Sequence, residues 1–150
     1  MVERIDTTPQ KWYRLRNPVR LVFNMLVCEV AKLMPVKIKN HMYRIIGVKI
    51  GEGTVIAPHV QIDPFFPEKI EIGENVLIGW SAKILTHEFD NESCLKGSVK
   101  IEDGALIGHG AANRPGVEIG ENATVGAQSF INRNVEENEK VGGIPVEKID

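Results

Sequence analysis

The sequence predicts an all-β solenoid of about four stacked coils behind a helical N-terminal segment. Aliphatic residues recur every six positions after Lys49, and the pentapeptide EIGEN occurs twice, at 71–75 and at 118–122. An α-helix, with about 3.6 residues per turn, cannot keep a period of six on one face. A short strand plus a turn can, and three such units close a triangular coil of about eighteen residues, as in a parallel β-helix. The repeated positions are Ile50, Ile56, Ile62, Ile72, Ile78, Ile84, Ile101, Ile107, Asn113, Ile119, Val125 and Ile131.

The segment before the coils is predicted to be helical. Asn17 is a good helix cap and Pro18 a good first-turn residue. A single apolar stripe follows and ends before Pro35, and a second, shorter helix is predicted from Asn40 to Ile46. We expect these helices to form a lid on the open first coil, because a solenoid needs a cap. The stripe consists of Val19, Val22, Phe23, Leu26, Val30, Leu33 and Met34.

Charge divides the chain at the same boundary. Residues 1–49 carry ten Lys or Arg against three Asp or Glu, a net charge of +7, whereas residues 50–150 carry eight against seventeen, a net of −9. The acidic larger part argues against a nucleic-acid partner. The basic part has a second interpretation, a peripheral amphipathic anchor that gives residues 11–49 a weak contact with the inner face of a membrane. Its apolar run is too short and too charged to span a bilayer. Cys28 and Cys94 make no disulfide framework, so a reducing cytoplasm is expected.

We therefore divide the chain into a helical cap (1–49), a β-helix (50–140) and a C-terminal tail (141–150). Two insertions break the repeat, as loops over 63–71 and 87–100. Both leave from the third edge of their coils, so both are expected to emerge on one side of the prism. Loops on a rigid scaffold are where chemistry is usually placed.

Both copies of EIGEN fall on the same edge of the prism, because the 47 positions between them equal two coils plus an insertion of eleven residues. Each such position pairs an acidic residue with Gly or Asn, which best tolerate the positive φ of a tight corner. We interpret these as solvated corners and not as an acidic functional site. The pairs are Glu52-Gly53, Glu74-Asn75, Asp103-Gly104 and Glu121-Asn122.

The other two edges bring distant residues together. His59, His87 and His109 fall on different coils or edges without metal-ligand spacing, so no metal site is expected. The segment GHGAAN lacks the strand–helix context and the last glycine of a phosphate-binding loop. The second edge stacks Pro58, Trp80, His109 and Ala127, and the third stacks Phe65, His87, Gly116 and Asn134, with Arg133 one place earlier.

From about Val48 to the C-terminus, the chain resembles the hexapeptide-repeat acyltransferases, and specifically the sugar O-acetyltransferases. The resemblance rests on the repeats and on ILTHEFD at 84–90, IGHGAANRPGVEIG at 107–120, VGAQSFINRNV at 125–135 and VGGIP at 141–145. It implies a left-handed parallel β-helix, a hand that general connection rules would not predict. It also implies an enzyme that moves an acetyl group from acetyl-CoA, without a metal, to a hydroxyl of a sugar or glycoconjugate.

The resemblance implies roles for individual residues. His87 falls at the position of the family's catalytic base, which takes the proton of the acceptor hydroxyl as it attacks the thioester. Either Glu88 or Asp90 would orient the His87 ring or hold the sugar, with Trp80 also at the substrate. Acetyl-CoA would lie in a groove between neighbouring subunits, with a basic residue near its phosphates. The implied contacts to acetyl-CoA are Gly108, His109, Gly126, Ala127, Arg133 and Lys148.

The chain also departs from the family pattern. Leu106 stands where Trp is usual, His109 where a small residue is usual, Asn113-Arg114 where an aliphatic pair is usual, and Glu147 where a basic residue is usual. These departures bear on CoA affinity, so the alternative function is a catalytically inactive hexapeptide-repeat trimer that binds a ligand or partner. A metal-dependent hydratase similar to the γ-carbonic anhydrases would need three converging histidines.

The expected assembly is a homotrimer. One prism offers only shallow, flat faces, whereas two prisms side by side form a cleft suited to a molecule as long as CoA. Closed three-fold symmetry gives three identical clefts. The loop after Ile84 would place His87 of one chain opposite Trp80 and His109 of the next.

Overall fold

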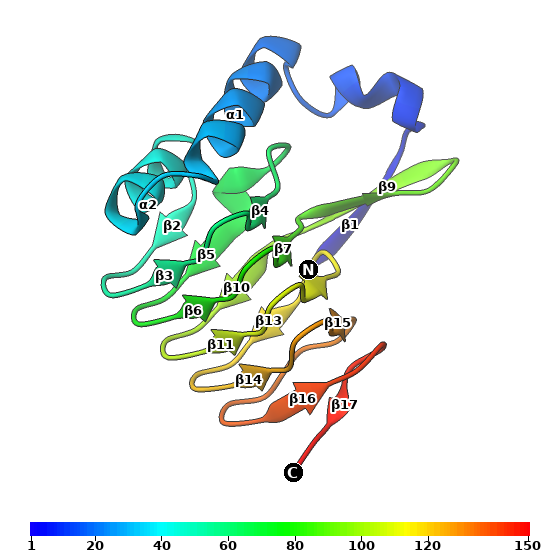
Figure 1. Ribbon diagram of the computed structural model, residues 1–150. Helices are drawn as coiled ribbons and strands as arrows, with labels where there is room; N and C mark the ends of the chain where they lie inside the picture. Colours follow the sequence, from blue (N-terminus) through cyan, green and yellow to red (C-terminus); the bar gives the residue numbers. More distant parts are fainter.

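The computed structural model describes residues 1–150. Its main body is a prism of stacked coils, with two helices at one end and the C-terminus at the other (Figure 1). Three parallel sheets form its sides, which confirms the parallel β-helix expected from the repeat. The first sheet contains β2 (Lys49–Ile50), β5 (Ile70–Ile72), β10 (Val99–Ile101) and β13 (Glu118–Ile119). The second contains β3 (Val55–Ile56), β6 (Leu77–Ile78), β11 (Leu106–Ile107), β14 (Thr124–Val125) and β16 (Lys140–Gly142). The third contains β4 (Gln61–Ile62), β7 (Lys83–Ile84), β12 (Ala112–Asn113) and β15 (Phe130–Ile131).

The aliphatic repeat fills the core in the expected register. Ile72 pairs with Ile101 in the first sheet, and Ile78 pairs with Ile107 in the second. All twelve repeat positions are buried. Burying one isoleucine contributes roughly 1.5–3 kcal/mol, so these stacked rows are the main source of stability.

The outward residues differ between the sheets. The first sheet carries charges, with ion pairs between Lys49 and Glu71 at 3.1 Å and between Lys100 and Glu118 at 3.5 Å. The second sheet carries an aligned apolar row that is about 40% exposed. A charged face is stable in water, whereas covering an apolar row removes it from water and lowers the free energy. The apolar row consists of Val55 (41%), Leu77 (44%) and Leu106 (38%).

The corner that holds both copies of EIGEN has the predicted backbone geometry. Gly53 has φ of +71° and Asn75 has φ of +53°. A Cβ atom on Gly53 would meet the Asn75 side-chain oxygen of the next coil, and the positive φ also favours glycine there. The corner continues through Gly104, Asn122 and Asn138, and the second edge has its own positive-φ positions at His59, Ser81, Gly110 and Gln128.

The helical cap contains a short 3₁₀ helix (Pro9–Arg14), α1 (Pro18–Ala31) and α2 (Val36–Ile45). Asn17 caps α1 as expected, because its Oδ1 accepts a hydrogen bond from the Val19 N–H at 2.9 Å. The predicted start of the second helix at Asn40 is wrong, since α2 begins at Val36 directly after Pro35. Proline ends one helix but is equally suited to precede the next, so it is a weak guide to the boundary.

Three polar side chains of α2 close the first coil. Backbone carbonyls of that coil have no preceding coil to pair with, and an unpaired buried carbonyl costs free energy. The lid expected from the sequence is therefore present in α2. The donors are Lys39 Nζ to the Ile56 carbonyl (3.1 Å), Asn40 Nδ2 to the Thr54 carbonyl (2.9 Å) and Arg44 Nη2 to the Ile50 carbonyl (2.8 Å).

α1 meets the coils through a different face from its apolar stripe. Its apolar stripe points away from the coils, and the face that packs on them consists of Leu21, Asn24, Cys28 and Ala31. Small side chains let the helix approach the third edge, where Asn24 Nδ2 donates to the Pro64 carbonyl at 2.8 Å. Neither helix has the length and hydropathy of a membrane-spanning segment.

The two insertions, at 63–71 and 87–100, follow strands of the third sheet, as the broken repeat predicts. The first contains a 3₁₀ turn (Pro67–Lys69), and the second is a hairpin of β8 (His87–Phe89) and β9 (Ser93–Gly97). β1 (Val2–Asp6) pairs with β9, so the first 49 residues are not all helical. The expected separate tail also differs, because β17 (Glu147–Lys148) pairs with β16 and extends the second sheet.

Candidate active site

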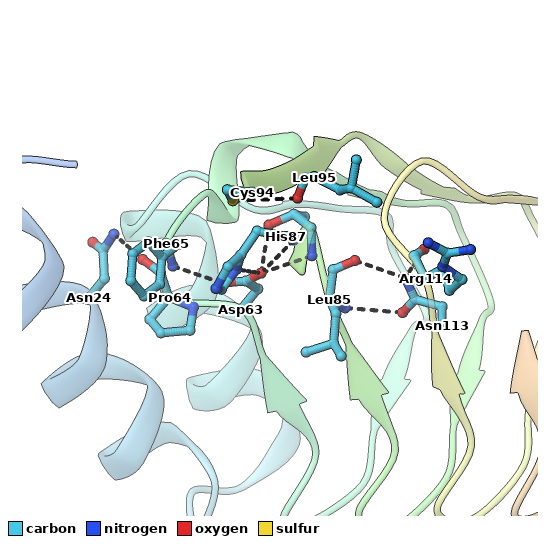
Figure 2. Close-up of polar contacts among 11 residues, drawn as sticks. Asn24, Asp63, Pro64, Phe65, Leu85, His87, Cys94, Leu95, Asn113 and Arg114 are labelled. Carbon is cyan, nitrogen blue, oxygen red and sulfur yellow. Dashed lines mark hydrogen bonds and ion pairs between the residues drawn. The ribbon is translucent and has the colours of Figure 1, made fainter. Parts of the chain in front are cut away.

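The third edge brings His87 together with a buried carboxylate. β4 and β7 are neighbouring strands of the third sheet, with Ile62 opposite Ile84. The residues that follow them, Asp63 and Thr86–His87, therefore meet at the corner. His87 Nδ1 lies 2.5 Å from Asp63 Oδ2, and the Asp63 side chain is fully buried (Figure 2).

Asp63 accepts hydrogen bonds at both carboxylate oxygens. Oδ1 accepts from the Phe65 N–H at 2.8 Å, and Oδ2 accepts from the N–H and the hydroxyl of Thr86, each at 2.8 Å, and from the His87 N–H at 3.1 Å. Burial alone would raise the pKa of Asp63, but the hydrogen bond and charge of His87 and the two backbone N–H groups outweigh it. The pKa of Asp63 therefore lies below its ordinary value, and the carboxylate is ionised at neutral pH.

An ionised partner at Nδ1 determines the state of the His87 ring. The carboxylate can only accept, so Nδ1 carries the proton and Nε2 holds the free lone pair. No hydrogen bond engages Nε2, and the His87 side chain is 18% exposed. A neutral imidazole held in this tautomer can take a proton from a hydroxyl group.

Residues of the next coil hold the chain on both sides of His87. Asn113 occupies an aliphatic position of the repeat, and its amide accepts from the Leu85 N–H at 3.0 Å and donates to the Leu85 carbonyl at 2.8 Å. Arg114 pairs with Glu88 at 3.1 Å. Asn113 therefore fixes the backbone two residues before His87 (Figure 2), and Arg114 pairs with the side chain of the residue after it.

Aromatic rings and a cavity surround the His87 ring. Phe65 lies 4.3 Å from it between ring centroids, and Phe89 meets it edge-on at 5.4 Å. A cavity of about 250 Å³ opens beside the ring between α1 and the third edge. Its polar lining includes Gln61 and the Glu29–Lys32 ion pair of 2.6 Å, groups that can hydrogen-bond an acceptor.

The sequence predicts the histidine but misses Asp63, and of the two acids offered to orient the ring or hold the sugar, neither lies at the ring. Glu88 pairs with Arg114. Asp90 accepts from the Glu92 and Ser93 N–H groups and from the Ser93 hydroxyl, so it holds the hairpin turn. Neither carboxylate contacts the ring, which Asp63 orients instead.

The second-edge stack is present as predicted, on another edge of the prism from His87. Trp80 and His109 follow paired strands of the second sheet, as does Ala127. Trp80 is 47% exposed and its ring lies 4.8 Å from that of His59. Within one chain this stack does not join the Asp63–His87 pair. Gly108 and Gly126 lie one residue before His109 and Ala127 on the same edge.

The predicted phosphate contact has a carboxylate partner of its own. Arg133 makes a two-pronged pair with Glu139, at 2.8 Å and 3.1 Å. The hydrogen bond from Arg133 is the largest cause that lowers the pKa of Glu139 to about 2. The basic residue expected near the CoA phosphates is therefore already paired with a carboxylate. Lys148, on β17, is exposed and forms no ion pair.

Other reactive groups of the chain lie outside this chemistry. Cys28 and Cys94 are free, buried thiols. Burial raises the pKa of Cys28 to about 12, so the thiol beside the cavity stays protonated. No group of three or more His, Cys, Asp or Glu side chains is arranged to hold a metal ion.

Sequence comparison identifies the family. Residues 98–133 match the family model of the bacterial transferase hexapeptide (six repeats). The chain is 36% identical to YvoF of Bacillus subtilis (strain 168), over 85% of this chain and 76% of that protein. It is 35% identical to SAR0816 of Staphylococcus aureus (strain MRSA252), over 89% of this chain and 84% of that protein. Both relatives are provisionally designated acetyltransferases. The chain therefore belongs to the hexapeptide-repeat acetyltransferase family.

Solved structures share the fold. The hexapeptide-repeat acetyltransferase VCA0836 of Vibrio cholerae, complexed with acetyl coenzyme A, matches with a TM-score of 0.73 at 21% identity, covering 89% of this chain and 90% of that one. A maltose O-acetyltransferase of Clostridium difficile 630 matches with a TM-score of 0.70 at 17% identity, covering 87% and 85%. At these identities the likeness establishes the fold, a left-handed parallel β-helix.

Proposed function

We propose that this protein transfers an acetyl group from acetyl-CoA to a hydroxyl of a sugar or glycoconjugate. The observation that carries the proposal is the Asp63–His87 pair, which leaves Nε2 as a free base beside a cavity. Designated acetyltransferases among the relatives, and the coenzyme complex of a structural neighbour, support the donor. The Gln61, Glu29 and Lys32 lining supports a polar, hydroxyl-bearing acceptor.

In the proposed reaction, His87 acts as base and then as acid. Nε2 takes the acceptor hydroxyl proton while the oxygen attacks the carbonyl carbon of the thioester. The C–S bond then breaks, and the departing CoA sulfur takes the proton from Nε2. The products are the acetyl ester and the free CoA thiol, and His87 returns to its neutral form. Asp63 stabilises the imidazolium that forms between the two proton transfers.

We propose that the donor lies between two subunits of a homotrimer. The second-edge stack is on another edge of the prism from His87, so a neighbouring chain must supply it to complete the site. Trp80 would border the acceptor, while Gly108, His109, Gly126 and Ala127 would contact the donor. Lys148 is better placed by charge than Arg133 to meet a CoA phosphate, because Glu139 occupies Arg133.

Thiol release from acetyl-CoA, measured with a panel of sugars, tests the function. The wild type should release CoA thiol with at least one acceptor. His87→Ala should lower turnover by about two to four orders of magnitude, with the fold intact by circular dichroism. Turnover within about twofold of the wild type would remove His87 from the mechanism.

A catalytically inactive trimer is the second candidate. The Arg133–Glu139 pair favours it, since this pair weakens one expected contact to the CoA phosphates. Calorimetry with CoA separates the two candidates. Micromolar binding would support the enzyme, and no measurable binding by the wild type would favour the scaffold.

We place this activity in the cytoplasm, where acetyl-CoA is supplied and where two free thiols persist. A weak membrane-surface contact of residues 11–49 belongs to the same proposal.

A further inference from the structure

The two faces of α1 differ in chemistry. The inner face packs on the coils through Leu21, Asn24, Cys28 and Ala31. The opposite side, which we call the outer face, consists of apolar side chains that are exposed to solvent. Figure 1 shows α1 at the end of the prism opposite the C-terminus. The outer face continues into the turn after the helix. The outer face consists of Val19, Val22, Phe23, Leu26, Val30 and Leu33.

The outer face is open to solvent over its whole length. Val19 is 79% exposed, Leu26 is 62% exposed and Leu33 is 69% exposed. These residues recur at the three- and four-residue spacing of one helical stripe, which surface helices normally turn toward a core. A contiguous exposed apolar stripe marks a surface that another body covers.

Basic side chains, which we call the basic rim, lie on α1 and in the chain segments directly before and after it. Lys11, Arg14, Arg20 and Lys37 are exposed and form no ion pair. The Arg20 guanidinium lies 5.8 Å from the centre of the Phe23 ring, at the border of the apolar side chains. The only acidic residue of α1, Glu29, is paired with Lys32. The body that covers this face must therefore be apolar and negatively charged at its rim.

A second copy of the chain does not meet this requirement. Contact between two outer faces would bring together two segments of net charge +7, which repel each other. The apolar row of the second sheet already offers a separate face for subunit contact. An anionic bilayer supplies acyl chains for the apolar side chains and negative headgroups for the basic rim. It also repels residues 50–150, with their net charge of −9, so the prism would project into water.

We propose that the outer face of α1 docks the protein on an anionic lipid surface. The apolar side chains lie at the boundary of headgroups and acyl chains, with the basic rim among the headgroups. Met25, Glu29 and Lys32, on the flank of the same helix, line the His87 cavity. Docking thus brings an acceptor hydroxyl carried by a membrane lipid next to His87. This consequence rests on the proposed function, whereas docking can be measured without any activity.

Cosedimentation with vesicles tests the docking. The wild type should bind vesicles of phosphatidylcholine mixed with phosphatidylglycerol, less tightly as salt rises, and should bind pure phosphatidylcholine weakly. Val22→Glu/Leu26→Glu should lower the partition coefficient at least about tenfold, because the outer face loses apolar area and gains negative charge. Arg14→Gln/Arg20→Gln should lower it roughly fivefold for each charge removed.

Ile144→Glu/Ile149→Glu is the matched control, since it adds the same charge to exposed apolar residues at the opposite end of the prism. It should bind vesicles like the wild type.

Failure of the wild type to bind anionic vesicles overturns the proposal, as does wild-type binding by Val22→Glu/Leu26→Glu. If that variant instead changes the molar mass without lipid, the outer face joins copies of the chain and the lipid proposal is wrong. Thiol release with a soluble acceptor is measured separately, so loss of docking and loss of activity remain distinguishable.

Discussion

Asp63 shows what a motif in one stretch of sequence leaves out. His87 is recognisable from ILTHEFD, but its partner lies 24 residues earlier, in QIDPFF. The signal was available in the repeat: Ile62 and Ile84 are one coil apart, so the residues that follow them, Asp63 and Leu85–His87, lie at the same corner. Glu88 and Asp90 are closer in sequence, but the hairpin carries both away from the ring.

At the scale of this residue, Asp63→Asn should lower kcat by about two to four orders of magnitude with little change in KM. The amide keeps the size of the carboxylate but cannot stabilise the imidazolium, and it allows the wrong ring tautomer. Steady-state kinetics with the best acceptor would measure the effect. Asp103→Asn is a control, since Asp103 bonds only a corner N–H at 2.8 Å. Equal kcat for Asp63→Asn and wild type would mean that His87 needs no carboxylate.

The helices and strands were predictable where a short period dictates the packing. Six-residue spacing predicts the coils, their register and the EIGEN corner, because each aliphatic position has one way to face the core. It does not predict the positive φ of Ser81 or Gln128, since neither residue type indicates a corner. Nor does the apolar stripe of α1 predict whether it faces the coils or the solvent. The inner face is defined by Cys28, Ala31 and the Asn24 bond to Pro64, details that depend on the shape of the third edge.

The fit of α2 onto the first coil makes a prediction at the scale of elements. Asn40→Ala should destabilise the protein by about 1–3 kcal/mol, because the buried Thr54 carbonyl loses its donor at 2.9 Å. Urea unfolding at one fixed protein concentration would measure the change. His41→Ala, at the exposed neighbouring position, should stay within about 0.5 kcal/mol of the wild type. Equal effects of the two substitutions would argue that α2 rests on the coil without closing it.

For the whole molecule, the first and second sheets differ in the outward side chains that they present to water. The first sheet pairs its charges across strands and is stable in water. The second sheet exposes its apolar row, and the second-edge stack of Trp80 and His109 lies beside that row. A neighbour packed on the second sheet would therefore cover the row and approach the stack. Its hairpin could then bring His87 to the stack, which one chain alone does not do.

We therefore expect light scattering to report a molar mass three times the 16.7 kDa of the chain. Leu77→Arg/Leu106→Arg should yield single chains, because two charges would be buried without partners in the contact. Glu118→Arg, on the charged first sheet, should leave the trimer intact. Trp80 fluorescence should be less accessible to a quencher in the wild type than in the Leu77→Arg/Leu106→Arg variant. Single chains in the wild type at working concentration would contradict both the trimer and the shared site. A trimer that survives Leu77→Arg/Leu106→Arg would instead place the contact on another side of the prism and separate His87 from the second-edge stack.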